Sequence, residues 1–216
     1  MSDVKMAVRL ATEDDAGAIA HVQARSYPEK LVRILQKPLS SATSAQFDEK
    51  SFEAIWATTL HHLSPYHRVL VATHGDLVVG FATVAPTEPV PATQYNMSTD
   101  HSDALSNKPG TDQGARSHGS GTPASGSTPQ APVAYELAGF DVIASHLGNG
   151  HHARLLAAAT DIIREAGGTE VYIWALAGDD VTTRYLDEAG FAPRGFARGY
   201  EIDAEQVTEQ LWWATL

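Results

Sequence analysis

The chain has 216 residues, enough to bury a sizeable core, and we expect residues 1–216 to form a single domain. Its net charge of −11 and its lack of any basic run argue against a nucleic-acid partner. There is no cysteine, which excludes disulfides, thiolate metal sites and a cysteine nucleophile. No segment has the length of a membrane span, and the N-terminal stretch lacks the apolar core of a secretory signal. We therefore expect a cytoplasmic protein without a membrane partner.

The first expected elements are a strand over residues 6–11 and a helix that follows it. Thr12 is placed to cap this helix, and Asp15 follows at the spacing of a capping box. Pro28 is expected to end the helix, because proline cannot continue the hydrogen bonding of a helix interior.

The next segments carry helical and hairpin patterns. Apolar side chains at three- to four-residue spacing predict a helix over residues 44–63, and two β-branched runs within residues 67–86 predict a hairpin. Residues 87–131 are rich in Ser, Gly, Pro and Thr and cannot bury enough apolar area to offset their backbone entropy. They are expected to form a disordered insertion loop between the third and fourth strands. A solvated loop without function is one interpretation, and a lid or a partner-binding loop is the other.

The remaining residues alternate between strand and helix patterns. The complete order predicts an α/β domain with a mixed central sheet flanked by helices. The last six elements are expected as a strand over 133–144, a helix from about 151 to 166, a strand over 169–176, a helix over 179–190, a strand over 195–202 and a short amphipathic helix over 203–216.

The segment "SHLGNGHHARLL" places two glycines directly before a helical pattern. Gly148 and Gly150 can adopt positive φ, and a helix N-terminus offers free N–H groups and a partial positive charge to an anion such as a diphosphate. His151, His152 and Arg154 would add donors there. An ordinary tight strand-to-helix turn is the alternative, and neither a Walker A loop nor a Rossmann fingerprint fits the context.

The chain resembles the GNAT superfamily of acyl-CoA-dependent N-acyltransferases over nearly its whole length, apart from the insertion. The resemblance rests on the order and spacing of "VRLATEDDAGAIAHV", "RVLVATHGDLVVGFATVAP", "GNGHHARLL" and "RYLDEAGFAPRG". The usual loop of the family reads Gln/Arg-x-x-Gly-x-Gly/Ala. This chain matches it at Gly148 and Gly150 but has Ser145 at the first position. Either this departure weakens coenzyme binding, or His146 and Arg154 compensate for it.

The resemblance implies a GNAT-like domain whose fourth and fifth strands separate and admit the pantetheine arm of acetyl-CoA. Backbone groups of residues 140–144 would pair with that arm, and N–H groups of residues 148–152 would hold the diphosphate. The implied cofactor-binding residues are Phe140, Val142, Ile143, Ala144, Leu147, Gly148, Asn149, Gly150, His151, His152 and Arg154.

Acyl transfer to an amine needs a base for the amine, donors for the oxyanion and a proton for the departing thiolate. Tyr185 stands at the tyrosine of the family's Tyr-x-x-x-Gly-Phe pattern and is the implied proton donor, although a tyrosine packed under the last strand would give the same pattern. Glu136 is our candidate for the base and Asp141 the other acid nearby, and either could equally be a solvated strand residue. A backbone N–H near Val142 or Ile143 would stabilise the oxyanion.

These inferences predict an N-acyltransferase that moves acetyl from acetyl-CoA to a primary amine of a small molecule or peptide, by direct attack in a ternary complex. The first rival is a non-catalytic acyl-CoA-binding sensor or regulatory module. The second rival is a phosphate-ligand domain of another α/β family. Neither the acceptor nor the oligomeric state can be read from the sequence.

The histidines and aromatic residues are weaker signals. The adjacent pairs His61-His62 and His151-His152 do not share a helix face, so no metal site is expected and surface or capping roles are favoured. The adjacent residues Trp212 and Trp213 cannot both be buried by one helix face, which puts one of them at a domain edge or against a partner subunit, as in a homodimer. Four aromatic residues are expected in the core or beside the acceptor: Tyr27, Phe52, Trp56 and Tyr66.

Overall fold

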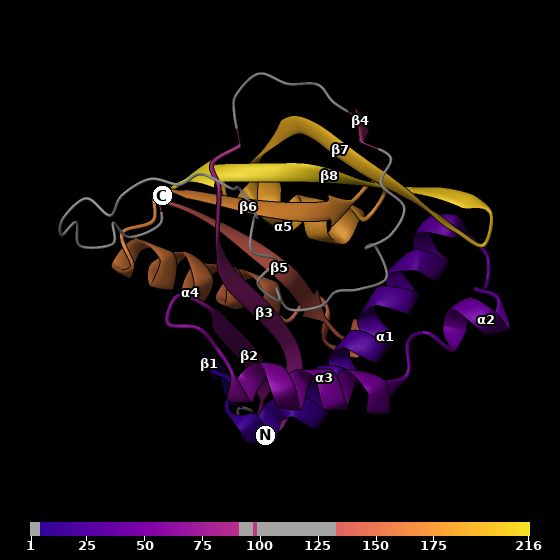
Figure 1. Cartoon of the computed structure of the whole chain (residues 1–216), viewed down its shortest axis with the longest axis horizontal. Coiled ribbons are helices and arrows are strands. Elements are labelled where there is room, and N and C mark those ends of the chain that lie inside the picture. Colours follow the sequence, from indigo (N-terminus) through magenta and orange to yellow (C-terminus); the bar gives the residue numbers. More distant parts are fainter. Residues whose placement is uncertain (1–4, 91–96, 99–132) are drawn as a thin grey trace, which may run out of the picture.

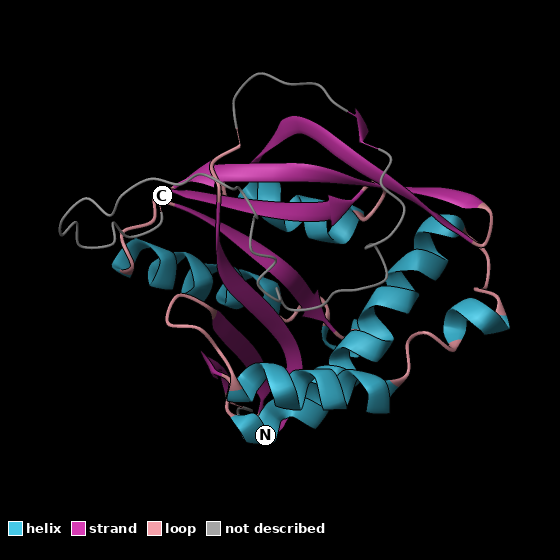
Figure 2. Ribbon diagram, viewed as in Figure 1, coloured by secondary structure: helices cyan, strands magenta, loops and turns pink. Residues whose placement is uncertain are grey.

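The computed structural model describes residues 5–90, 97–98 and 133–216. In these ranges the chain forms one mixed, eight-stranded sheet with helices on both faces (Figure 1 and Figure 2). The strand order across the sheet is β1-β2-β3-β5-β6-β8-β7-β4. The strands are β1 Met6–Leu10, β2 Arg68–His74, β3 Leu77–Thr87, β4 Met97–Ser98, β5 Ala134–Val142, β6 Glu170–Leu176, β7 Ala192–Ile202 and β8 Glu205–Thr215.

The helices fall into two groups along the chain. The first group precedes the β2–β3 hairpin, and the second alternates with β5, β6 and β7. The helices are η1 Glu13–Asp15, α1 Ala16–Leu35, α2 Ser41–Ser44, α3 Glu49–His61, η2 Ala144–His146, α4 His151–Glu165 and α5 Asp180–Glu188. None of those in the described ranges combines the length and the apolar character that crossing a membrane requires.

The expected α/β class and the mixed sheet are confirmed. β1, β2, β3 and β5 pair antiparallel, β5 and β6 pair parallel, and β8 pairs antiparallel with both β6 and β7. The expected insertion lies between the third and fourth predicted strands, which are β3 and β5. Residues 91–96 and 99–131 lie outside the described part of the chain, so the disorder of this segment stays a prediction. Within it, β4 pairs in parallel with β7.

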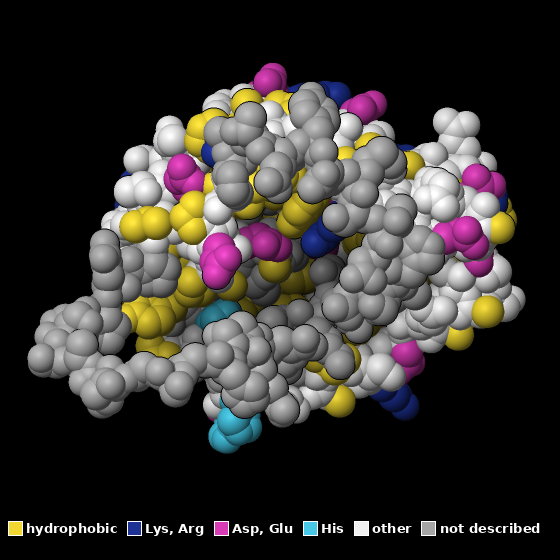
Figure 3. All heavy atoms as spheres, turned by 45° about the horizontal axis from the view of Figure 1, so that its top comes forward, with side chains coloured by type: hydrophobic (Ala, Val, Ile, Leu, Met, Phe, Trp, Pro, Cys, Tyr) yellow, Lys and Arg dark blue, Asp and Glu magenta, His cyan; other side chains and the backbone are white. Residues whose placement is uncertain are grey.

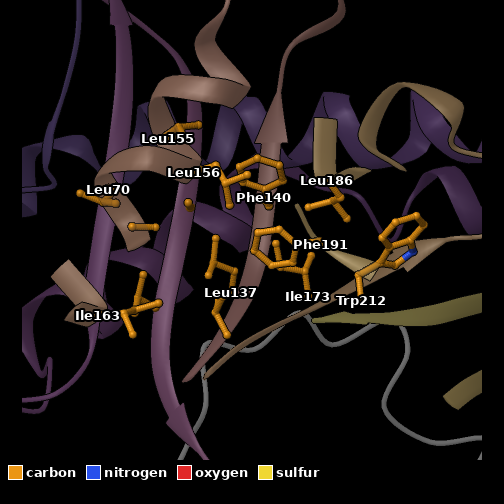
Figure 4. Packing of buried hydrophobic residues seen from close by; sticks show 14 of the residues in the cluster. Leu70, Leu137, Phe140, Leu155, Leu156, Ile163, Ile173, Leu186, Phe191 and Trp212 are labelled. Carbon is orange, nitrogen blue, oxygen red and sulfur yellow. The ribbon is translucent and has the colours of Figure 1, made fainter. Parts of the chain in front are cut away.

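Two separate hydrophobic clusters cover the two faces of the sheet. Alternating strand residues send one set of side chains toward α4 and α5 and the other set toward α1 and α3. On the first face, Leu155 and Leu156 of α4, Leu186 of α5 and Phe140 of β5 interdigitate in the core (Figure 4). This packing fixes the start of α4 against the end of β5.

Helix α1 is longer than predicted, because Pro28 lies inside it rather than at its end. The missing N–H of Pro28 removes one intrahelical hydrogen bond. The helix continues because the residues beyond the proline are held by tertiary contacts. Leu31 is fully buried in a cluster with β6, β7 and β8, and Lys30 forms buried ion pairs. At the other end of the helix, the Thr12 N–H donates to the Asp15 carboxylate at 2.7 Å, as the capping pattern predicted.

The helix expected over residues 44–63 begins later than predicted: α3 covers Glu49–His61, and the single turn of α2 ends at Ser44. Ser40 caps α2 through the N–H of Thr43, and Asp48 caps α3 through the N–H of Ser51. Of the periodic apolar residues, all but Phe47 lie in α3, and Trp56 is buried there against Phe81 of β3. Asp48, a residue that often caps helices, lies within the predicted range and could have shown that the helix starts after it.

The tail over residues 203–216 was predicted as a helix, and this prediction was wrong: Glu205–Thr215 is strand β8. Asp203 and Ala204 both have positive φ, as a tight hairpin turn requires, and they return the chain beside β7. Val207, Glu209 and Leu211 are buried at period two, which is the strand pattern. Trp212 is buried on the opposite face and Trp213 is half-buried, so a strand accommodates both side chains.

Candidate active site

Strands β5 and β6 pair over only half of their length. Their parallel register runs from Ala134 opposite Glu170 to Leu137 opposite Ile173 and stops there, whereas β5 stays paired with β3 as far as Val142. The two strands visibly diverge from one end to the other (Figure 1). From residue 138 onward, β5 therefore has a backbone edge that β6 does not cover, and the expected separation of the fourth and fifth strands is confirmed.

A local irregularity in β5 accompanies the divergence. Gly139 has a φ of +86°, and the register between β3 and β5 shifts between Ala82 and Val84. A side chain at Gly139 would meet the ring of Phe81 at 2.9 Å, so only glycine fits this position. Bulges of this kind bend a strand and increase its twist, which carries the end of β5 away from β6.

The free edge of β5 can be assigned residue by residue. The Ile143 N–H donates to the Val79 carbonyl at 2.9 Å, so the Ile143 amide is already bonded to β3. Hydrogen-bonding direction alternates along an antiparallel strand, and the backbone groups of Phe140 and Val142 therefore point into the gap. Of the two backbone N–H groups predicted as oxyanion donors, that of Val142 is free to donate, whereas that of Ile143 is already hydrogen-bonded to β3.

The gap leads to the N-terminus of α4. Gly148 and Gly150 have φ of +79° and +77°, as the sequence predicted. No acceptor in the described ranges receives a hydrogen bond from the N–H groups of residues 148–152. Arg154 folds back over this loop and donates to the Asn149 carbonyl at 3.1 Å. The loop therefore presents several free donors beside one guanidinium.

The two histidines that follow the loop do not extend this donor set. The rings of His151 and His152 are only 1% and 2% exposed and point into the protein, contrary to our prediction that they add surface donors. They stand four residues before Leu155 and Leu156, so they share the buried face of α4. This spacing was the signal in the sequence that could have shown their burial.

Each buried histidine has its own surroundings. His151 lies with His74 and His146, at ring-centroid distances of 5.7 and 6.1 Å, and burial lowers its pKa, with a further contribution from these two histidines and Arg154. Burial, followed by the charge of Lys30, lowers the pKa of His152 to about 4. Both rings are therefore neutral at physiological pH. The described residues contain no group of side chains arranged to hold a metal ion.

Tyr185 reaches the strand gap through His152. The His152 ring stacks on Tyr185 with centroids 4.9 Å apart and meets Phe140 edge-on at 5.1 Å. A continuous set of rings thus connects the free edge of β5 with α5. Tyr185 is half-buried, and the stacked His152 ring places it against α4.

On the α1 side of the gap, a lysine that the sequence did not single out bridges the two diverging strands. Lys30 Nζ lies 2.6 Å from an Asp141 carboxylate oxygen on β5 and 3.6 Å from Asp179, which follows β6. Arg33 and Thr182 also bind Asp179, at 3.0 and 2.6 Å. Burial alone would lower the pKa of Lys30, but the two carboxylates outweigh it and raise the pKa. Asp141 is therefore held in an ion pair.

Glu136 faces the same pocket with no such partner. No hydrogen bond or ion pair joins its carboxylate to another residue in the described ranges, and burial raises its pKa. Arg198 is close enough to offset part of that increase, and Glu209 adds to it. The surface here is hollowed, and acidic side chains lie beside hydrophobic ones (Figure 3). Of the two acids considered as a base, Glu136 is the one left free.

The aromatic residues expected near an acceptor have separate fates. Tyr27 lines the pocket between β5 and β6 together with Trp174 of β6. Phe52 and Trp56 of α3 pack in the core against α1 and the sheet. Tyr66 is 44% exposed and lies outside the pocket. Only Tyr27 of the four therefore reaches the candidate site.

No protein-family profile and no curated protein matches the sequence. Solved structures do match it in three dimensions, although at low sequence identity. An acetyltransferase of the GNAT family from Streptococcus pneumoniae is 12% identical with a TM-score of 0.56, and the alignment covers 98% of this chain and 100% of that one. A ribosomal-protein-alanine N-acetyltransferase from Brucella melitensis is 16% identical with a TM-score of 0.58, covering 97% and 99%.

This chain has the GNAT fold. PaiA N-acetyltransferase from Thermoplasma acidophilum, solved in complex with coenzyme A, is also similar, with 11% identity, a TM-score of 0.55 and coverage of 95% and 98%. The GNAT fold matches over nearly the whole chain, as the motifs implied.

Proposed function

We propose that this protein is an N-acetyltransferase that transfers acetyl from acetyl-CoA to a primary amine by direct attack in a ternary complex. The observation that carries the proposal is a strand edge, free from residue 138 onward, that runs directly into a helix N-terminus with free N–H groups. Such an edge suits an extended amide-bearing arm, and such a terminus suits a diphosphate.

The binding residues follow from this arrangement. Backbone groups of Phe140 and Val142 pair with the pantetheine arm, and Ala144 and Leu147 continue the path to the loop. The N–H groups of residues 148–152 hold the diphosphate, and Arg154 adds a positive charge beside it. Ser145 supplies no long side chain for this task; its hydroxyl lies 3.0 Å from the His146 ring.

The reaction needs one bond formed and one broken. The neutral amine attacks the thioester carbon, and the tetrahedral oxyanion is stabilised by the Val142 N–H. The carbon–sulfur bond then breaks, and the thiolate takes a proton from Tyr185. Glu136, directly or through water, accepts the proton that the amine loses. The sheet is open at the gap, where Glu136 lines the pocket and Phe140 leads through His152 to Tyr185.

A non-catalytic acyl-CoA-binding module is the second candidate, and the short Ser145 at the first loop position favours it. Both candidates bind acetyl-CoA, but only the enzyme forms acetylated product. Both candidate functions are compatible with the expected location in the cytoplasm, and both can be carried out without a partner subunit.

The test begins with thermal unfolding in acetyl-CoA. At about 100 times the dissociation constant, binding stabilises the fold by about 2.7 kcal/mol, which corresponds to a rise of roughly 5–10 °C for a domain of this size. Mass spectrometry of amine mixtures incubated with acetyl-CoA then separates the two candidates. The absence of any thermal shift would refute both.

A further inference from the structure

The pocket between β5 and β6 has an unbalanced set of charges. Four carboxylates and two cations line it, and the cavity itself encloses about 70 Å³, so only the reacting end of an acceptor enters it. The carboxylates belong to Glu136, Asp141, Asp179 and Glu209, and the cations to Lys30 and Arg198.

Each cation at the pocket is already paired within the protein. Lys30 lies 2.6 Å from Asp141, and Arg198 lies 2.5 Å from Glu209. Asp179 has Arg33 as its partner at 3.0 Å, just behind the pocket wall. The described residues therefore offer no unpaired positive charge here.

Arg198 is held by a second contact as well. Its guanidinium lies over the ring of Trp174, another lining residue, 4.4 Å from the centroid, which holds it against the pocket wall. Glu136 is the one lining carboxylate without a partner in the described ranges. A ligand that enters this pocket meets one carboxylate without an ion-pair partner, whose charge the nearby Arg198 offsets only in part.

From these pairings we infer that the acceptor is a primary amine with no carboxylate beside its amino group, such as an arylalkylamine or the N-terminus of a peptide, and that free amino acids are rejected. The inference rests on the proposed function. An ammonium group entering the pocket is attracted by Glu136. A neighbouring carboxylate would be repelled by Glu136 and would find no free cation, so its desolvation would be uncompensated.

The intrinsic reactivity of the two acceptors would favour the amino acid, which is the opposite of the preference that we expect from the pocket. The α-amino group of an amino acid is less basic than a simple alkylamine, so a larger share of it is neutral and ready to attack at a given pH. A preference for the simple amine therefore reports the pocket and not the intrinsic reactivity of the acceptor.

The test compares phenethylamine, L-phenylalanine and L-phenylalaninamide as acceptors for the full-length protein with saturating acetyl-CoA. We expect kcat/KM for phenethylamine to exceed that for phenylalanine by roughly 100-fold, or about 2.7 kcal/mol. Phenylalaninamide has the size of phenylalanine without its charge and should lie within about tenfold of phenethylamine. Equal rates for phenethylamine and phenylalanine, or an amide as poor as phenylalanine, would overturn the inference.

Glu209→Gln gives a gain-of-function control, because it releases Arg198 from its ion pair and leaves a free cation in the pocket. The phenethylamine-to-phenylalanine ratio should then fall by about tenfold, and an unchanged ratio counts against the role of charge. If acetyl-CoA binds but no amine is acetylated, the proposed acetyl transfer is refuted, whereas the inference about the acceptor is still open to test by binding. Calorimetric titration of the coenzyme A-saturated protein with the same compounds then decides: phenylalanine binding as tightly as phenethylamine overturns the inference.

Discussion

The Tyr185 ring stacks on the His152 ring with 19° between their planes, so α4 fixes the position of the phenol beside the strand gap. Tyr185→Phe keeps this stack and removes only the hydroxyl. We expect kcat to fall by roughly 100-fold, the low end for loss of a general acid, while the free energy of unfolding changes by less than about 0.5 kcal/mol. Steady-state kinetics and urea unfolding measure the two effects. A variant with normal kcat would remove Tyr185 from the mechanism.

The pH dependence of the reaction should report Glu136. A base must be deprotonated to act, and burial raises the pKa of Glu136, so kcat/KM should fall with decreasing pH at values above the usual range of a glutamate. Glu136→Gln should lower kcat/KM and remove this inflection, which leaves only the fall caused by protonation of the amine itself. Glu201→Gln, at an exposed position on β7, is the matched control and should leave the profile unchanged. An inflection at an unchanged pH in Glu136→Gln would assign the base elsewhere.

Gly148 and Gly190 have nearly the same backbone conformation, so alanine variants of the two distinguish an effect on coenzyme binding from the effect of backbone strain. Gly148 has φ +79° and Gly190 has φ +85°, and no heavy atom lies within 4 Å of a Cβ added at either. Alanine should destabilise both sites by about 1 kcal/mol, because L-residues disfavour positive φ. Only Gly148→Ala should weaken acetyl-CoA binding, by about tenfold in calorimetry, since its methyl group enters the space proposed for the diphosphate. Equal affinities in the two variants would contradict this placement.

Removing the charge of Lys30 should be costly to the fold. Lys30→Met leaves Asp141 buried without its partner, and loss of one member of a buried pair destabilises by about 3 kcal/mol. The double variant Lys30→Met/Asp141→Asn should regain most of this, because the isolated charge is gone. Lys5→Met, at an exposed position, is the control for the lysine side chain. Urea unfolding of the wild type, these three variants and the single Asp141→Asn variant tests the expectation, and additive losses in the double variant would refute it.

The ion pair before α1 should contribute to acid stability. Arg9 binds both carboxylate oxygens of Asp15, at 2.6 and 2.8 Å, and lowers its pKa to about 2 from 3.8. A carboxylate whose pKa is lower in the folded state stabilises the fold at pH values above its pKa in the unfolded chain. This stabilisation is lost as the pH falls to the folded-state pKa, which for Asp15 means between about pH 4 and 2. Because Arg9 is half-exposed, we expect about 1 kcal/mol.

Asp15→Asn is the variant that measures this contribution. The wild type should exceed it in unfolding free energy at pH 7, and the difference should disappear near pH 2. A difference that stays constant across this range would show that hydrogen bonding to Thr12, and not the charge of Asp15, supplies the stability.

Much of the fold could be predicted because local signals and tertiary packing agree. The β2–β3 hairpin, α4 and its glycine loop are specified by turn residues and by apolar periodicity within a few residues. The errors occurred where distant contacts decide the outcome. Pro28 ends a helix in isolation, but the buried Leu31 and Lys30 carry α1 beyond it. Residues 205–215 have helical-looking spacing, but β6 and β7 both offer them an edge to pair with.

The candidate site divides in the same way. The loop glycines, Tyr185 and Glu136 occupy recognisable positions in sequence patterns. Lys30 does not, because its role depends on α1 crossing the gap between β5 and β6, and nothing near it in the sequence marks that crossing. The burial of His151 and His152 follows from helical phase once the start of α4 is known.

The gap between β5 and β6 gives the sheet an edge in its interior, in addition to the outer edges at β1 and β4. Open strand edges invite pairing with other polypeptides, and an inward-pointing charge is one of the devices that prevent it. Asp141, in the unpaired part of β5, is such a charge, and Lys30 of α1 holds it inward. Its presence should therefore disfavour aggregation through this opening while the coenzyme is not bound.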